Sequence, residues 1–335
     1  MLNFILIGAG RIGKMHAQNI ANHPLCNLSY IYDVDTELAS SVAETSKAKI
    51  ASSAEDAIND KDVDAVFIAS ATNTHIDYII LAAQAGKAIF CEKPIDLDIT
   101  KVDYCRKKIK NFNVPIQIGF NRRFDPSHKK LKLSKDEGEI GKLEKIIITS
   151  RDPGPPSKEY LKISGGIFRD MVIHDFDFCR FILGNDPIQE ISAHASQLFS
   201  DDIKDVEDFD TSMIIMKSQS GVLCHINNSR RAIYGYDQRV EIFGSNGMLI
   251  SNNQTPNSLE KYNATFTGSK ELIYHFFIER YHQAYKDQLD DFVNMVVNKL
   301  SPSATFEDGR KALIIANAAY VSLKNNNSST RILYD

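Results

Sequence analysis

The chain has 335 residues, of which 43% are hydrophobic and 24% charged, and its 39 basic and 43 acidic residues give a net charge of −4. This composition excludes global disorder, and so nearly neutral a chain lacks the basic field that counterion-driven nucleic-acid binding requires. The length predicts about two domains. No run approaches the roughly 18 apolar residues of a membrane span, so we expect a cytoplasmic protein.

Strands and helices alternate over the first 120 residues. The strand-like runs are continuous and apolar, and short turns separate them from the helical segments. This texture is typical of a parallel sheet covered by helices on both faces, so we predict an α/β domain over residues 1–120. The expected strands are 4–7, 28–32, 65–69, 88–91 and 115–119, and the expected helices are 12–22, 37–46, 75–85 and 99–110.

After residue 120 longer β-prone runs follow one another, with Ser-, Asp- and Gly-rich turns between them. Runs of strands with segregated helices predict an α+β domain with an open, mostly antiparallel sheet over residues 121–335. With no long linker, the two domains are expected to pack around a cleft. The expected strands are 143–150, 188–195, 211–216, 222–227 and 239–243, and the expected helices are 168–183, 278–297 and 306–323.

A glycine-rich motif follows the first expected strand and opens the first helix. Gly8 permits a tight turn, Gly10 lets the main chain approach a pyrophosphate, and Gly13 lets the helix pack close to the strand. The N-terminus of the helix adds free N–H groups for the phosphates. The motif therefore predicts a Rossmann dinucleotide site made of Gly8, Ala9, Gly10, Arg11, Ile12 and Gly13.

The second expected strand ends at Asp33, about 20 residues after the motif, where an acid holds the adenosine ribose hydroxyls. Its carboxylate would repel a 2′-phosphate, and neither Val34 nor Asp35 supplies a guanidinium to neutralise one. We therefore predict NAD rather than NADP as the cofactor. The alternative is a strand-ending aspartate without a ligand.

Lys93 lies in Glu92-Lys93-Pro94, directly after the expected strand 88–91. Ligands of open α/β sheets lie beyond the carboxyl ends of the strands, so Lys93 is expected to point into the cofactor crevice. An isolated lysine after a strand is more often a solvated charge, so this position alone does not predict a catalytic role for Lys93.

The second signal is the apolar segment 168–183, expected to form one largely buried helix ended by Gly184. Asp170, His174 and Asp177 fall at i, i+4 and i+7 of this helix, which is one face. Three ionisable groups on a buried helix are costly unless they are paired or face a wet cavity. The cleft between the domains is such a cavity, although a hydrogen-bonded core histidine is the ordinary alternative for His174.

These groups predict oxidation of an alcohol. A neutral His174 would act as general base, Lys93 would hydrogen-bond the same oxygen, and Asp170 would bind a neighbouring hydroxyl or orient the imidazole. A metal site of Asp170, His174 and Asp177 is the competing interpretation, but it lacks a further ligand, so no metal is expected. The role of Asp177, catalytic or structural, stays open. The five cysteines form no CxxC pair, which argues against a zinc site or a disulfide framework.

Nearly from end to end, the sequence resembles the Gfo/Idh/MocA oxidoreductases. The combination of EKP with Asp-x-x-x-His is specific for that family, and SRDPGPP followed by SGGIFRDMVIHDFD is most similar to its inositol-oxidising members. The shared segments are GAGRIG at 8–13, YDVD at 32–35, ASATNTH at 69–75, EKP at 92–94, GFNRRFDPS at 119–127, SRDPGPP at 150–156, SGGIFRDMVIHDFD at 164–177 and DGRKALIIANAAY at 308–320.

The resemblance implies a Rossmann domain followed by an open sheet that mediates a homotetramer. It implies that Lys93, Asp170 and His174 are the catalytic set and that the peptide bond before Pro94 is cis. It further implies cofactor contacts at Ser70, Asn73, His75, Glu92 and Lys93, and substrate contacts at Asn121, Arg122, Asp152 and Tyr236.

The expected activity is therefore NAD-dependent oxidation of a ring hydroxyl of a cyclic polyol, myo-inositol to its 2-keto form. Other inositol isomers and pyranose sugars are the alternative substrates. An alternative of another class is a non-catalytic NAD-binding sensor or scaffold, which would have no chemical reason to keep Lys93, Asp170 and His174. Neither nucleic acid nor a membrane is an expected partner.

Overall fold

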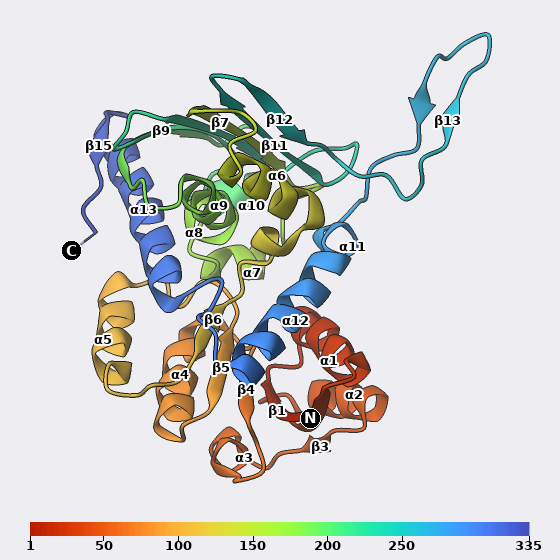
Figure 1. Cartoon of the computed structure of the whole chain (residues 1–335), viewed down its shortest axis with the longest axis vertical. Helices are drawn as coiled ribbons and strands as arrows, with labels where there is room; N and C mark the ends of the chain where they lie inside the picture. Colours follow the sequence, from red (N-terminus) through yellow and green to blue (C-terminus); the bar gives the residue numbers. More distant parts are fainter. Residues whose placement is uncertain (335) are drawn as a thin grey trace. The chain divides into compact units, whose positions relative to one another are not determined.

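The computed structural model describes residues 1–334, and the chain divides into two compact units (Figure 1). The first unit comprises Met1–Asn121 and Tyr285–Lys311, and the second comprises Arg122–Ala284 and the segment from Ala312 onward. Within the described residues, no helix combines the length and the apolar character needed to cross a membrane.

The first unit is built on a six-stranded sheet whose neighbouring strands are all parallel. Its order, β3-β2-β1-β4-β5-β6, is that of a dinucleotide-binding fold, so the predicted Rossmann sheet is confirmed. The strands are β1 (Leu2–Ile7), β2 (Cys26–Tyr32), β3 (Lys49–Ile50), β4 (Ala65–Ile68), β5 (Ala88–Cys91) and β6 (Ile116–Ile118), and the helices are α1 (Arg11–Asn22), α2 (Thr36–Ser46), α3 (Ala54–Asn59), η1 (Thr72–Thr74), α4 (His75–Gln84) and α5 (Ile99–Ile109).

Residues 285–311 complete this unit, although the sequence assigned them to the second domain. Leu289 and Phe292 of helix α12 (His282–Asn298) are buried in the same apolar cluster as Phe4 and Phe90. A fully buried side chain of this kind contributes about 1.5 to 3 kcal/mol. The expected boundary differs here because one face of the parallel sheet needs an apolar cover, which the chain supplies from a distant segment.

The second unit contains a seven-stranded sheet of order β12-β11-β7-β10-β9-β8-β15. Strands β7 and β10 are parallel and the other neighbours are antiparallel, so the predicted open, mostly antiparallel sheet is confirmed. The strands are β7 (Leu143–Arg151), β8 (Ile188–Ser196), β9 (Thr211–Ser218), β10 (Leu223–Ser229), β11 (Asp237–Gly244), β12 (Gly247–Ser251) and β15 (Thr330–Arg331), with a separate hairpin of β13 (Glu260–Lys261) and β14 (Ser269–Lys270).

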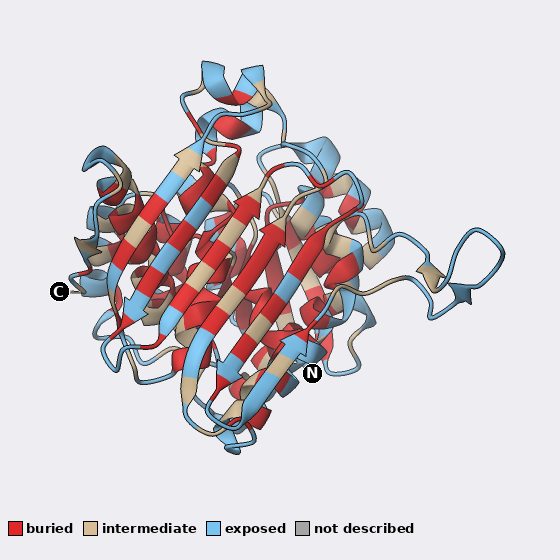
Figure 2. Ribbon diagram, turned by 90° about the horizontal axis from the view of Figure 1, so that it is seen from above, coloured by how far each residue is buried: buried red, intermediate tan, exposed pale blue. Residues whose placement is uncertain are grey.

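Buried and exposed residues alternate along the strands of this sheet, as the red and pale blue bands in Figure 2 show. The buried face packs against helices whose core residues include Leu131, Phe176 and Ile315. The opposite face leaves Met213 and Ile215 more than half exposed. The remaining helices are η2 (Asn121–Phe124), α6 (Pro126–Asp136), α7 (Lys158–Ile163), α8 (Ile167–Asp170), α9 (Ile173–Leu183), α10 (Asp201–Asp205), α11 (Phe277–Arg280) and α13 (Phe306–Lys324).

The predicted continuous helix over 168–183 is wrong, because α8 and α9 are separated by a turn at Met171 and Val172. The Ile167 carbonyl accepts hydrogen bonds from the N–H groups of both Met171 and Val172, each at 3.0 Å. One carbonyl thus serves two successive amides and the helical register slips. Asp170 and His174 therefore belong to different helices, not to one straight face. The predicted helix over 278–297 is likewise divided, into α11 and α12.

Candidate active site

The glycine loop of the first unit has a shape that only glycine permits at two positions. Gly8 has φ +102°, and a Cβ there would lie 2.4 Å from the Ala69 carbonyl oxygen. A Cβ on Gly13 would lie 1.9 Å from the carbonyl oxygen of Gly8. At Gly10, by contrast, no atom of the described chain lies within 4 Å of an added Cβ, so the main chain is open on that side. This is the surface that a diphosphate approaches in a dinucleotide fold.

Asp33 is held against the loop. Its Oδ2 accepts a hydrogen bond from the Ala9 N–H at 2.6 Å, and its Oδ1 accepts one from the Asp35 N–H at 2.9 Å. Helix α1 begins at Arg11, and the Gly10 N-cap offers no side chain to cap its first amides. The first-turn N–H groups of α1, which no N-cap side chain covers, and the open side of Gly10 fit the phosphates of a dinucleotide. The half-buried Asp33 carboxylate fits a ribose.

The three predicted cofactor residues after β4 differ in their exposure to solvent. Ser70 is half-buried and its hydroxyl lies 2.7 Å from that of Thr74, while Asn73 is exposed on η1. His75 is only 1% exposed, and burial lowers its pKa. Its Nδ1 lies 2.8 Å from the Pro94 carbonyl oxygen and its Nε2 lies 3.0 Å from that of Ser70. The imidazole thus links two main-chain segments.

Glu92, Lys93 and Pro94 directly follow β5, as predicted, and the Lys93–Pro94 peptide bond is cis. The Glu92 Oε1 lies 2.8 Å from His16 Nε2, and its Oε2 accepts a hydrogen bond from the Lys93 N–H at 3.3 Å. Lys93 is half-buried at the carboxyl edge of the parallel sheet.

Asp170 of the second unit is half-buried between two partners from other segments. The Tyr160 hydroxyl donates a hydrogen bond to its Oδ1 at 2.8 Å, and Arg230 Nη1 lies 3.3 Å from its Oδ2. Arg230 also reaches Asp208, with Nη2 3.4 Å from Oδ2. His174 is half-buried although its neighbours in α9 are almost all buried.

Asp177 has a structural role. Its two oxygens accept bonds of 2.5 and 2.7 Å from Arg123, and both side chains are buried. The competing metal site is not formed: among residues 1–334 no three His, Cys, Asp or Glu side chains gather in a way that suits a metal ion.

Of the four predicted substrate residues, three are buried and the fourth, Asp152, is half-buried. Arg122 is buried and forms an ion pair with Asp175, and its Nη2 lies 3.2 Å from the Ser150 hydroxyl and 3.5 Å from that of Tyr236. Asn121 and Tyr236 are also buried.

Asp152 is half-buried just after β7. Burial raises the pKa of its carboxyl to about 6, against the opposing charge of Arg230 and with a further raising contribution from Asp170.

Sequence reasoning missed Tyr160 and Arg230, which hold Asp170, and Asp175, which pairs with Arg122. Asp175 carried a local signal, because it is one more charge within an apolar helix. Arg230 follows strand β10, far from Asp170 in the sequence, and nothing in its neighbours indicates that its side chain is only 1% exposed.

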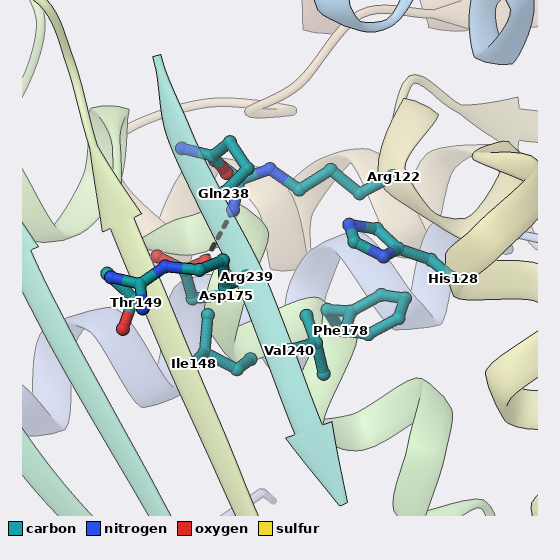
Figure 3. Close-up of a pocket in the computed structure, with 9 residues that line it drawn as sticks. All are labelled: Arg122, His128, Ile148, Thr149, Asp175, Phe178, Gln238, Arg239 and Val240. Atoms are coloured by element: carbon teal, nitrogen blue, oxygen red, sulfur yellow. Dashed lines mark hydrogen bonds and ion pairs between the residues drawn. The ribbon is translucent and has the colours of Figure 1, made fainter. Parts of the chain in front are cut away.

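A gap next to the Arg122–Asp175 pair is shown in Figure 3. It is too small to hold a water molecule, so it is a packing gap and not a ligand site. Its lining residues are Arg122, His128, Ile148, Thr149, Asp175, Phe178, Gln238, Arg239 and Val240.

Comparisons with known proteins show the family of the chain. Residues 2–120 match the model of an oxidoreductase family with an NAD-binding Rossmann fold, and residues 128–250 match the GFO/IDH/MocA C-terminal domain. The chain is 42% identical over 324 residues to the inositol 2-dehydrogenase of Rhizobium meliloti (strain 1021), covering 96% of this chain and 97% of the relative. It is 34% identical over 325 residues to the scyllo-inositol 2-dehydrogenase (NAD(+)) of Bacillus subtilis (strain 168), covering 96% and 93%.

A crystal structure of a myo-inositol dehydrogenase from Corynebacterium glutamicum ATCC 13032 has a TM-score of 0.95 and 42% identity, covering 99% of each chain. Residues 2–120 and 128–250 each match a model of the same family, and the two relatives are covered over 97% and 93% of their length. The chain therefore belongs to the Gfo/Idh/MocA family of NAD-binding oxidoreductases.

Proposed function

We propose that this protein oxidises a secondary ring hydroxyl of a cyclic polyol with NAD, and that its preferred substrate is myo-inositol, converted to the 2-keto form. The observation that carries the proposal is the setting of Asp170, held between Tyr160 and Arg230, four residues before the half-buried His174. The names of the relatives, inositol 2-dehydrogenase among them, support the substrate class.

The glycine loop and Asp33 hold the cofactor in this proposal. Main-chain N–H groups at the start of α1 bind the diphosphate, and the Asp33 carboxylate accepts hydrogen bonds from the ribose hydroxyls. Bound NAD supplies the hydride acceptor. A ribose 2′-phosphate would meet the Asp33 charge, so NADP is disfavoured.

His174 is the proposed general base. The hydroxyl proton moves to its imidazole while the carbon gives up its hydrogen with both bonding electrons, so the C–O single bond becomes a carbonyl. The Lys93 ammonium donates a hydrogen bond to the same oxygen and stabilises its developing negative charge. Asp170 accepts a hydrogen bond from a neighbouring hydroxyl.

Four residues are the proposed substrate contacts, Asp152 through a direct polar role and Arg122 through an indirect one. Asp152 has a half-buried carboxyl that suits a polyol hydroxyl. Arg122 is already paired with Asp175, so we expect it to act by orienting Tyr236 and the surrounding main chain. Asn121 is buried beside the loop that follows β6. A relative named for scyllo-inositol makes that isomer the first rival substrate.

We further propose a homotetramer formed through the seven-stranded sheet. Its outer face carries exposed apolar side chains on adjacent strands, including Met213, Ile215 and Leu223. Such a face is typical of a buried protein interface. Light scattering of the purified protein tests the assembly, and the predicted cytoplasmic location stays a prediction.

The decisive experiment is a panel of inositol isomers and pyranose sugars, each with NAD and NADP, followed by the absorbance of the reduced cofactor. Myo-inositol with NAD should give the highest kcat/KM. Loss of the general base or of the oxygen-binding ammonium, by His174→Asn or Lys93→Met, should lower kcat by about 10²- to 10⁴-fold while NADH still binds.

The exposed residues Lys101 and His275 provide matched controls, since Lys101→Met and His275→Asn should leave turnover unchanged. Wild-type turnover by the Lys93 or His174 variant would reject that residue's role, and no turnover of any polyol by the wild-type protein would favour the sensor alternative.

A further inference from the structure

Two buried histidines of the first unit contact the segment that carries Lys93. His16, on α1, contacts Glu92, and His75, at the start of α4, contacts Pro94. We propose that His16 and His75 are positioning residues that fix Glu92-Lys93-Pro94 from both ends and thereby place the Lys93 ammonium for catalysis. This inference rests on the role proposed for Lys93 above.

The His16 contact is specific and buried. His16 is 1% exposed, and its Nε2 lies 2.8 Å from Glu92 Oε1. Its ring packs against Phe67 and Phe90, with centroids 4.3 and 5.7 Å away. No hydrogen-bond partner among residues 1–334 reaches its Nδ1. We therefore assign the ring hydrogen to Nε2, which donates to the Glu92 carboxylate, because a hydrogen on Nδ1 would be buried without an acceptor.

Glu92 is in turn tied to the next residue. Its Oε2 accepts a hydrogen bond from the Lys93 N–H at 3.3 Å, and its own N–H donates to the Ile68 carbonyl at 2.9 Å. The Glu92 carboxylate also lies against the main chain of Gly119, where an added Cβ would be 2.6 Å from Oε2. The carboxylate thus has no room to move toward Gly119, and both its oxygens are engaged within the protein. Glu92 is better explained as an anchor for Lys93 than as a direct cofactor ligand.

His75 holds the other end of the segment. Its Nδ1 lies 2.8 Å from the Pro94 carbonyl oxygen, and its Nε2 lies 3.0 Å from the Ser70 carbonyl oxygen. Ser70 belongs to the loop after β4, whose predicted partner is the cofactor. Both neighbours are hydrogen-bond acceptors, and a neutral imidazole has a single N–H, so we assign that hydrogen to Nδ1, which donates to the Pro94 carbonyl. The ring then packs between the turn after Lys93 and the loop of Ser70 at the same edge of the parallel sheet.

The contacts of the two histidines matter for how accurately the Lys93 ammonium is placed. Lys93 has three rotatable donors on a flexible stem, so the protein must fix its main chain to aim the ammonium at one oxygen. A displacement of about 1 Å in a reacting group can cost roughly 10²-fold in rate. Loss of either histidine contact should accordingly lower kcat more than it weakens cofactor binding.

The test compares His16→Leu and His75→Leu with the conservative variants His16→Gln and His75→Asn, which keep an N–H donor near the lost nitrogen. The matched control is His23→Leu. His23 follows α1 in the same unit and pairs with a different carboxylate, Asp290 of α12, at 3.0 Å. Thermal unfolding of each variant, kcat and KM with polyol and NAD, and NADH binding by fluorescence are measured.

We expect the leucine variants to lose about 10- to 100-fold in kcat, with the dissociation constant of NADH changed by less than about threefold. His16→Gln should recover most of the loss, and His23→Leu should retain wild-type kcat. In a Lys93→Met background, His16→Leu should cause no further loss, because a positioning residue acts only through the group it places.

An equal further loss in the Lys93→Met background, or wild-type kcat in both leucine variants, would overturn the inference while leaving the role of Lys93 intact. Wild-type turnover by Lys93→Met itself would instead overturn the proposed function. If His16→Leu does not fold, Glu92→Gln removes the charge from the other side of the same hydrogen bond. It should likewise lower kcat with little change in NADH binding and cause no further loss in the Lys93→Met background.

Discussion

The glycine loop of the first unit and the carboxylates around α8 and α9 of the second differ in what holds their polar groups. The loop is shaped by main chain, and Asp33 is bound by amide N–H groups. In the second unit Asp170, Asp175 and Asp177 each pair with an arginine from another segment, Arg230, Arg122 and Arg123 respectively. Main-chain N–H groups suffice for the half-buried Asp33, whereas carboxylates as buried as Asp175 and Asp177 need an opposite charge beside them.

The largest expected effect comes from breaking one of these ion pairs. Asp177→Asn should lower the free energy of unfolding by about 3 to 5 kcal/mol, because it removes a buried negative charge that two hydrogen bonds join to the Arg123 guanidinium. Urea denaturation measures this change. The kcat of the folded variant should stay close to wild type, since Asp177 is structural.

Asp201→Asn is the control, because the Asp201–Lys204 pair lies on the surface and should change stability by less than about 0.5 kcal/mol. A loss of kcat in fully folded Asp177→Asn enzyme would contradict the structural assignment.

In the glycine loop, two substitutions should affect different properties: one should lower the stability of the fold, and the other should weaken cofactor binding. Gly13→Ala places a Cβ against the Gly8 carbonyl and should lower the unfolding free energy by about 1 to 3 kcal/mol or more. Gly10 has φ −65° and ψ −170°, which alanine also adopts, and open space beside it. Gly10→Ala should therefore keep wild-type stability but weaken NADH binding by about tenfold, equivalent to roughly 1.4 kcal/mol.

Thermal unfolding and fluorescence titration of both glycine variants provide the comparison. Unchanged NADH binding in Gly10→Ala would mean that the diphosphate does not approach the main chain at this position.

The smallest expected effect is a pH dependence at Asp152 of the second unit. Its pKa is raised to about 6, so the carboxyl takes up a proton as the pH falls through this value and then accepts hydrogen bonds less well. The KM for the polyol should rise by up to about tenfold between pH 6 and pH 5.

The same raised pKa means that ionised Asp152 lowers the stability of the fold at pH 7 and above, and that this penalty is relieved as the pH falls through 6 toward the unfolded value. Asp152→Asn should accordingly flatten the KM profile and be more stable than wild type at pH 8 but not at pH 4. Identical KM profiles for the two proteins would remove Asp152 from the substrate site.

The glycine motif, Asp33 and the position of Lys93 after β5 could be predicted because each is a local property of the chain. A turn that only glycine permits, an acid at the end of a strand and a charge beyond an apolar run depend on neighbours within a few residues. The two sheet types were predictable for a similar reason. Apolar strands that alternate with helices indicate a parallel sheet, and successive strand runs with segregated helices indicate a mostly antiparallel one.

The interrupted helix at Met171 and Val172 could not be predicted in this way. Nothing in the local apolar pattern requires the Ile167 carbonyl to serve two amides.

The sequence by itself determined the fold class and the cofactor type, because periodicity and motif spacing are short-range signals. Only the tertiary structure decided that Asp177 is bound by Arg123, that Asp170 is held by Tyr160 and Arg230, and that residues 285–311 complete the first unit. These contacts join segments far apart in the chain, and a buried charge takes whichever opposite charge the packing brings within reach.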